Sequence, residues 1–196
     1  MSIWERRLQR AGALETLWPH AGDLLRFYRH VLEFQRDAAP RMAGPDDLRP
    51  ELLALLRRIA PAAEGAAGRI LAEAWAVGRP HAACPPAVAV LREDLEAVAI
   101  RRSLVCAHGG EEAPHPRLDC PSCGEADPAK LPRFTAREIP WIRIDACDAC
   151  RTYLKAVDVS KEPDAEPVVD ELASTPLDVI ARERGYAKIT PNLAGL

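Results

Sequence analysis

The chain has 196 residues, of which 48% are hydrophobic and 28% charged, and its net charge at pH 7 is -3. This length and composition are typical of a soluble globular protein that can bury a core. The charge is uneven, since residues 1–110 carry 15 Lys/Arg and 13 Asp/Glu whereas residues 111–196 carry 11 and 16. The net charge does not suggest a general nucleic-acid or membrane-surface binder, because both classes usually carry a basic excess.

Neither an export signal nor a membrane span is predicted. The Arg6-Arg7 pair could belong to a twin-arginine signal, but Gln9, Arg10 and Glu15 interrupt the apolar stretch that such a signal needs. No window reaches the ~18 uninterrupted apolar residues of a transmembrane helix. We therefore expect a cytoplasmic protein, in which closely paired cysteines bind metal or take part in redox chemistry.

Residues 1–110 predict a bundle of about four helices. Apolar residues recur at three- and four-residue spacing between about residues 13 and 39. A second helix opens at Asp46-Asp47, a third runs over about residues 64–77, and a fourth follows Pro85-Pro86. The fourth helix would carry five apolar residues, namely Val88, Leu91, Leu95, Val98 and Val105. Because strand-like alternation is absent from this half, the predicted fold class is mainly α.

The composition changes after Ala107, where repeated prolines exclude long helices. Two short strands are predicted at 134–137 and 141–144. Helix returns near residues 166–173, and a second piece starts at Thr175 and ends at Gly185. The sequence thus predicts three parts: a helical bundle (1–110), a rubredoxin-like or zinc-ribbon metal knob (111–165) and a helical C-terminal tail (166–196).

Four of the six cysteines form two C-x2-C pairs with a spacer of 23 residues between them. Two residues between cysteines allow a tight turn to direct both sulfurs at one point, and two such pairs match the zinc-ribbon pattern. Four thiolates leave no open coordination position, so the expected ion is structural, and it is zinc or iron since both accept four sulfurs. The predicted ligands are Cys120, Cys123, Cys147 and Cys150. Cysteines without metal and a redox dithiol remain the alternatives.

The other candidate residues have weaker patterns. Cys84 and Cys106 are unpaired in sequence, and Cys106 is predicted to be a small buried side chain on the fourth helix. His108 and His115 flank the cysteine segment and could complete a mixed site. Three more histidines are predicted to lie on or beside helices without a catalytic role: His20, His30 and His81. No phosphate loop, nucleophile elbow or zinc-hydrolase motif is present, so the sequence predicts no enzyme.

Short motifs follow one another from the second cysteine pair onward. They are Cys147-Asp148-Ala149-Cys150-Arg151-Thr152-Tyr153-Leu154-Lys155, Asp170-Glu171-Leu172-Ala173, Leu177-Asp178, Gly185-Tyr186 and Asn192. Their order and spacing resemble the end of the formate dehydrogenase accessory protein family, FdhE. The resemblance implies a cytoplasmic, non-enzymatic maturation factor that contacts the formate dehydrogenase catalytic subunit. It also implies a rubredoxin-like metal site onto which the four predicted ligands map.

The chain departs from this family in two respects. Typical members are longer and carry four C-x2-C pairs in two ribbons, whereas this chain has two pairs that match the second ribbon. Pro176 also interrupts what is usually an unbroken helix. We therefore expect a short variant whose partner surface is incomplete.

Two other functions stay open at this point. A nucleic-acid-binding ribbon needs Lys/Arg around the knob, which the acidic residues 111–196 oppose. A rubredoxin-like electron carrier or thiol oxidoreductase would need bound iron or a reactive thiol. Neither a membrane nor a nucleic acid is an expected partner, and the sequence does not predict the oligomeric state.

Overall fold

The computed structural model describes residues 1–44, 46–77, 88–96, 99–106, 112–116 and 119–193. Within 88–106, only the side chains of Arg92 and residues 103–105 are described. The chain divides into two compact units. The helices before residue 78 form the first unit, and the described residues from 88 onward form the second.

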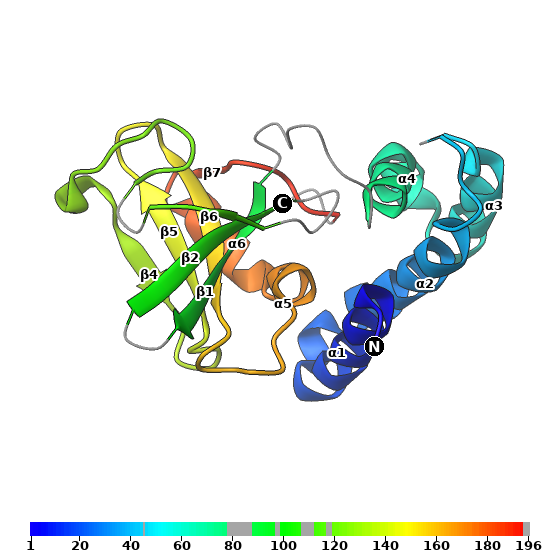
Figure 1. Cartoon of the computed structure of the whole chain (residues 1–196), viewed down its shortest axis with the longest axis horizontal. Helices are drawn as coiled ribbons and strands as arrows, with labels where there is room; N and C mark the ends of the chain where they lie inside the picture. Colours follow the sequence, from blue (N-terminus) through cyan, green and yellow to red (C-terminus); the bar gives the residue numbers. More distant parts are fainter. Residues whose placement is uncertain (45, 78–87, 97–98, 107–111, 117–118, 194–196) are drawn as a thin grey trace. The chain divides into compact units, whose positions relative to one another are not determined.

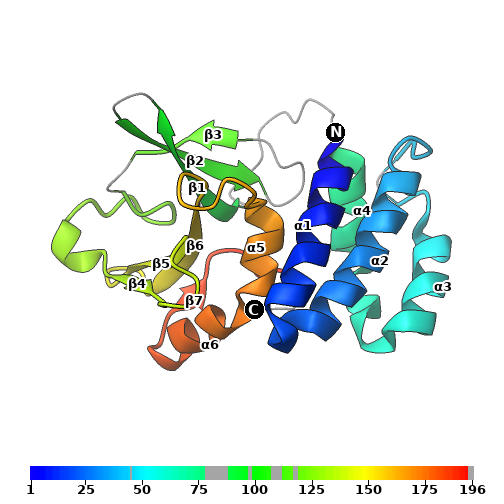
Figure 2. The ribbon, with the colours of Figure 1, turned by 90° about the horizontal axis from the view of Figure 1, so that it is seen from below.

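Four α-helices form the described part of the first unit (Figure 2). The first begins with a capping box, in which the Ser2 hydroxyl accepts a hydrogen bond from the Glu5 backbone N–H and the Glu5 carboxylate accepts one from the Ser2 N–H. The helices are α1 (Ile3–Leu17), α2 (Gly22–Ala38), α3 (Arg49–Ile59) and α4 (Ala67–Ala76), with 3-10 segments η1 (Pro19–Ala21) and η2 (Pro61–Ala66) before α2 and α4.

The single helix predicted between about residues 13 and 39 is in fact two helices. Proline disfavours the α conformation for the residue before it, and Trp18 accordingly has φ -125° and ψ 77°. As a result α1 ends before Pro19, and α2 begins only after η1. The capping box at Ser2 is the sequence signal that would have placed the start of α1.

Most buried side chains of the bundle are apolar, and a polar group of Arg7, Gln35 and Glu73 lies among them. The Arg7 guanidinium, whose side chain is 1% exposed, lies 2.6 Å from the Glu73 carboxylate. The Gln35 amide donates to the same carboxylate (3.0 Å) and to the Ile70 carbonyl (2.9 Å). These bonds join α1, α2 and α4, and they provide the partners that buried charged groups require.

A seven-stranded sheet forms the centre of the second unit (Figure 1). The strand order is β3-β2-β1-β6-β5-β4, and β7 pairs with β6. The β6 strand is antiparallel to β5 and parallel to β1 and β7. The strands are β1 (Val88–Glu96), β2 (Ala99–Cys106), β3 (Glu112–Pro114), β4 (Arg133–Thr135), β5 (Ile142–Cys147), β6 (Thr152–Asp158) and β7 (Ala187–Lys188).

The prediction of a fourth helix is wrong, because β1 and β2 form a hairpin there. The apolar residues have helical spacing, but the register pairs Leu91 with Leu104 across the hairpin. In addition, β1 pairs with β6, for example Val90 with Lys155. Pairing with a strand that is distant in the sequence overrides the local preference for a helix. The spacing of the apolar residues between 88 and 105 does not reveal such pairing. Cys106 is consequently the last residue of β2 and is not helical.

The C-terminal helices agree with the predictions. They are α5 (Pro167–Ala173), which packs against β1 and β6, and α6 (Thr175–Glu183). Pro176 lies in the first turn of α6, where it breaks no hydrogen bond. Gly185 follows the end of α6 with φ 81°, the left-handed conformation that commonly ends a helix. The two predicted short strands correspond to β4 and β5, whereas β6 and β7 were not predicted.

The mainly helical class is confirmed, with six α-helices in the described part of the chain and a cysteine cluster that could form a metal knob. The sheet is larger than the sequence indicated. The division into parts 1–110, 111–165 and 166–196 stays a prediction, because packing into units does not define which parts fold independently. Within the described ranges, every helix is too short or too polar to cross a membrane.

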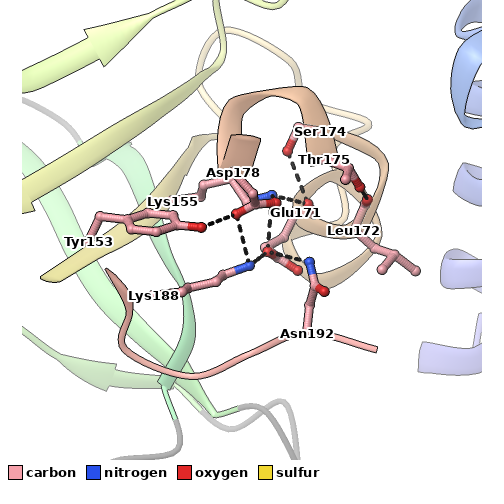
Figure 3. A network of polar contacts seen from close by, with 9 residues as sticks. All are labelled: Tyr153, Lys155, Glu171, Leu172, Ser174, Thr175, Asp178, Lys188 and Asn192. Atoms are coloured by element: carbon pink, nitrogen blue, oxygen red, sulfur yellow. Dashed lines mark hydrogen bonds and ion pairs between the residues drawn. The ribbon is translucent and has the colours of Figure 1, made fainter. Parts of the chain in front are cut away.

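Four charged side chains are buried together where α5 and α6 meet the sheet (Figure 3). Lys155 on β6 lies 2.6 Å from the Asp178 carboxylate and 3.1 Å from that of Glu171. Lys188 on β7 contacts both carboxylates as well. Each of these side chains is at most 3% exposed. Tyr153 donates its hydroxyl to Asp178 at 2.8 Å. Two ammonium groups thus balance two carboxylates, as burial of charge requires.

The acid stability of the second unit is expected to depend on Glu171. Burial opposes ionisation, but Lys155 and Lys188 hold the pKa of Glu171 below its usual 4.5. A carboxyl with a depressed folded-state pKa stabilises the fold fully above its unfolded pKa, and loses this effect as the pH falls through the folded-state value. Glu171→Gln should therefore be less stable than wild type at neutral pH, with the difference shrinking below pH 4.5. Urea unfolding across pH measures this, and a constant difference would contradict it.

Candidate metal centre

The strands β4, β5 and β6 bring the two cysteine pairs together. Cys147 is the last residue of β5, and Cys150 lies in the turn before β6. The first pair precedes the 3-10 turn η3 (Pro128–Lys130) and β4. The Asp148 N–H donates to the Lys130 carbonyl at 2.8 Å, which ties the second pair to the segment that follows the first.

The four cysteine sulfurs could hold a single metal ion. All of them lie within 4.8 Å of one another. The Sγ–Sγ distance is 3.7 Å both between Cys120 and Cys150 and between Cys123 and Cys147. Tetrahedral ligands at about 2.3 Å from an ion are about 3.8 Å apart, whereas a disulfide requires about 2.05 Å. The donor set and its spacing therefore fit one tetrahedral ion bound by four thiolates.

A residue with positive φ follows each cysteine pair. Gly124 has φ 75° and Arg151 has φ 57°. The Gly124 N–H donates to the Cys120 carbonyl at 2.9 Å and closes the first turn. Glycine adopts this left-handed conformation freely, whereas arginine does so at a cost. Residues 120–124 are called the first knuckle below, and residues 147–151 the second knuckle.

Hydrogen-bond donors face both sulfurs of the second knuckle, but the pKa values of the two thiols shift in opposite directions. Burial raises the pKa of Cys147 to about 12, although the N–H groups of Cys150 and Ala149 point at its sulfur and oppose the rise. Burial also disfavours ionisation of Cys150, but the hydroxyl and N–H of Thr152 bring its pKa down to about 6. The Thr152 hydroxyl oxygen lies 3.0 Å from that sulfur. Since metals bind the deprotonated sulfur, such donors suit a metal–thiolate site.

The C-terminal segment holds the second knuckle in place. Tyr186 and Arg151 donate to the same Asp148 carboxylate oxygen, at 2.7 Å and 2.8 Å. Arg151 also donates to the Arg184 carbonyl at 2.6 Å, and its guanidinium lies 4.1 Å from the centre of the Tyr186 ring. The Arg151 carbonyl accepts from the Ala187 N–H at 2.9 Å, where β7 joins β6. We call Asp148, Arg151 and Tyr186 the clamp.

The clamp residues were not among the predicted site residues. Tyr186 is far from Asp148 and Arg151 in the sequence, so no local spacing connects them. The signal that could have found them is their membership of the short motifs Cys147–Lys155 and Gly185-Tyr186. The structure gives these motifs a physical meaning, because it brings them into contact beside the thiols.

Gly185→Ala is expected to destabilise the second unit. Gly185 has φ 81°, and a Cβ there would lie 3.0 Å from the Arg151 guanidinium. The left-handed conformation costs a residue with a Cβ about 1–2 kcal/mol. Thermal or urea unfolding measures the loss. Gly65→Ala is the control, since a Cβ at Gly65 meets nothing within 4 Å. Equal stability of the two variants would contradict the prediction.

The other predicted candidates do not join the thiols in the described structure. The Nε2 atom of His115 lies 3.1 Å from the Asp119 carbonyl oxygen, so this ring has a backbone partner. His20 and His30 belong to the first unit, on η1 and α2. Outside the described residues lie His81, Cys84, His108 and the side chain of Cys106.

Comparisons with known proteins match the cysteine-bearing part of the chain. Residues 118–194 match the family model described as FdhE, C-terminal domain. An FdhE homolog of Aquifex aeolicus is 32% identical over 103 residues, which are 53% of this chain and 35% of that protein. FdhE of Escherichia coli is 38% identical over 77 residues, 39% of this chain and 24% of that protein. The match thus spans about a third or less of the length of these relatives.

A solved structure has the same fold over nearly the whole chain. The crystal structure of the FdhE protein from Pseudomonas aeruginosa superposes with a TM-score of 0.74. The match covers 98% of this chain and 96% of that one, with 18% sequence identity. At this identity the likeness establishes a shared fold for the helices and the sheet alike.

Proposed function

The chain belongs to the FdhE family through residues 118–194, and on this premise we propose that it is a formate dehydrogenase accessory protein. In this role it binds the immature catalytic subunit in the cytoplasm and catalyses no reaction itself. One observation carries the proposal: the segment that matches the family contains a four-thiol cluster with tetrahedral spacing.

We also propose that the four thiols bind one zinc or iron ion. Four thiolates fill a tetrahedral coordination sphere, so the ion would have no open position for substrate and would act as a cross-link. The chain's own residues supply the rest of the site, because the N–H groups and hydroxyl directed at the sulfurs stabilise their ionised form. The proposed ligands are Cys120, Cys123, Cys147 and Cys150.

Metal analysis tests the ligand proposal. Protein purified without added metal should contain one equivalent of zinc or iron, and Cys147→Ser should reduce this content strongly. Cys84→Ser is the control, since the proposed site does not use Cys84. A colourless protein that contains zinc would indicate a structural ion. A red protein that contains iron and can be reduced and reoxidised reversibly would favour the rubredoxin-like electron carrier. Wild-type protein without metal after anaerobic purification would contradict the proposal.

A complementation experiment tests the accessory role. The chain is expressed in a bacterial strain that lacks its own FdhE, and formate dehydrogenase activity is measured in extracts. Wild type and Cys84→Ser should restore activity, whereas Cys147→Ser should not. Affinity-tagged chain from formate-grown cells should also recover the catalytic subunit. Failure of both experiments with well-folded protein would count against the accessory role.

A nucleic-acid-binding ribbon is the weaker candidate. The segment that holds the cysteine cluster is acidic, with 11 Lys/Arg against 16 Asp/Glu in residues 111–196. Phosphate binding needs an excess of basic side chains. A salt-dependent shift of generic DNA by the purified chain would revive this function.

A further inference from the structure

The two knuckles are held by different kinds of contact. Among the described residues, the backbone bonds of the first knuckle are local: the Cys120 N–H donates to the Glu125 carbonyl at 2.8 Å, and the Gly124 N–H donates back to Cys120. Glu125 in turn pairs with Lys130 near the surface. Each knuckle has one buried cysteine, Cys120 and Cys147, but the other cysteine is exposed in the first knuckle (Cys123) and half-buried in the second (Cys150). The backbone bonds described for the first knuckle thus stay within residues 120–125, and the bond from the Asp148 N–H to the Lys130 carbonyl connects the segment after it to the second knuckle.

The second knuckle is connected to buried parts of the second unit. Its clamp partner Tyr186 is 7% exposed. Tyr186 is followed directly by β7, which pairs with β6. Lys188 on β7 is held in turn by the buried carboxylates of Glu171 and Asp178 (Figure 3). The clamp thus connects the turn of the second cysteine pair, through β7, to the buried group of charged side chains shown in Figure 3.

We propose that the second knuckle is a preformed half-site, and that a metal ion binds Cys147 and Cys150 first before the first knuckle closes over it. This inference rests on the proposed metal binding. Asp148, Arg151 and Tyr186 are positioning residues in this scheme, since they contact the turn that carries the sulfurs rather than the ion. Outer partners of this kind commonly change metal affinity by about 10- to 100-fold.

Two half-site variants test the order of binding with Co²⁺ alone under anaerobic conditions. Cys120→Ser with Cys123→Ser keeps the second knuckle, and Cys147→Ser with Cys150→Ser keeps the first. The thiolate-to-cobalt absorption band reports the affinity of each. The variant that keeps the second knuckle should bind Co²⁺ about tenfold more tightly, or better. Equal affinities, or tighter binding by the first knuckle, would overturn the inference.

Variants of the clamp residues test whether the clamp causes the difference in Co²⁺ affinity between the two half-sites. Arg151→Gly removes the guanidinium while permitting the positive φ, so it separates loss of the clamp from backbone strain. It should weaken Co²⁺ binding by the second knuckle about tenfold and leave binding by the first unchanged. Tyr186→Phe, which loses only the hydrogen bond to Asp148, should have a smaller effect in the same direction.

The outcomes separate this inference from the metal proposal. If wild-type protein gives no cobalt band, the four-thiol site itself is wrong. If wild type binds Co²⁺ but Arg151→Gly affects both half-sites equally, the clamp acts only on general stability and the inference is overturned. Circular dichroism of each variant confirms that the helices and the sheet are retained.

Discussion

If the four thiols bind an ion as proposed, a chelator is expected to lower the thermal midpoint of the second unit by about 10 °C or more. Structural zinc contributes roughly 10–16 kcal/mol in isolated small peptides. Here the cysteine segment is attached to a sheet with its own core, so we expect a smaller loss in the free energy of unfolding, of about 3 kcal/mol. For a domain of this size, 1 kcal/mol corresponds to about 4–8 °C. Differential scanning calorimetry with and without chelator measures the shift.

The loss of structure on chelation should also be local. Hydrogen exchange should show that residues 119–131 lose protection, because the backbone bonds described for the first knuckle are local and the proposed ion would cross-link it to the second knuckle. Residues 152–158 should keep theirs, since β6 is paired on both edges. The helices α1–α4 serve as the internal control. An unchanged thermal midpoint, or uniform loss of protection over the whole unit, would contradict a local metal cross-link.

The cysteine cluster could be predicted because the spacing of cysteines within each pair is a local feature of the sequence. Each C-x2-C turn aims two sulfurs at one point, whatever surrounds it. The sequence thus predicted which four thiols would converge, and the structure brings them within 4.8 Å. It could not predict that Thr152 bonds one sulfur or that Tyr186 supports one turn, because those contacts depend on how β6 and β7 pair.

The helices were predictable in type but less so in extent. The periodic apolar residues correctly predicted helices where α2 and α3 lie, since an amphipathic face is a local property of the sequence. The break at Pro19 was overlooked because the apolar pattern continues across it. The β1–β2 hairpin was misread, since its apolar spacing imitates a helix and its decisive partner, β6, lies far along the chain. Long-range strand pairing of this kind is invisible to a local pattern.

Lys155→Met is expected to destabilise the second unit by about 3–5 kcal/mol, the usual cost of removing one partner from a buried ion pair. Lys155 contacts both Asp178 and Glu171, and its side chain is 0% exposed. Without it, two buried carboxylates would share the single ammonium of Lys188. Urea unfolding of the metal-loaded protein at neutral pH measures the loss.

The double variant Lys155→Met with Asp178→Asn separates charge imbalance from lost packing. It leaves one ammonium, on Lys188, and one carboxylate, on Glu171, so the charges balance again. The asparagine carbonyl oxygen can still accept the hydrogen bond that Tyr153 donates at this position. The double variant should therefore be clearly more stable than the sum of the two single losses predicts. Simple additivity would mean that the four groups do not act as one balanced cluster, and the large loss for Lys155→Met would then have to come from packing alone.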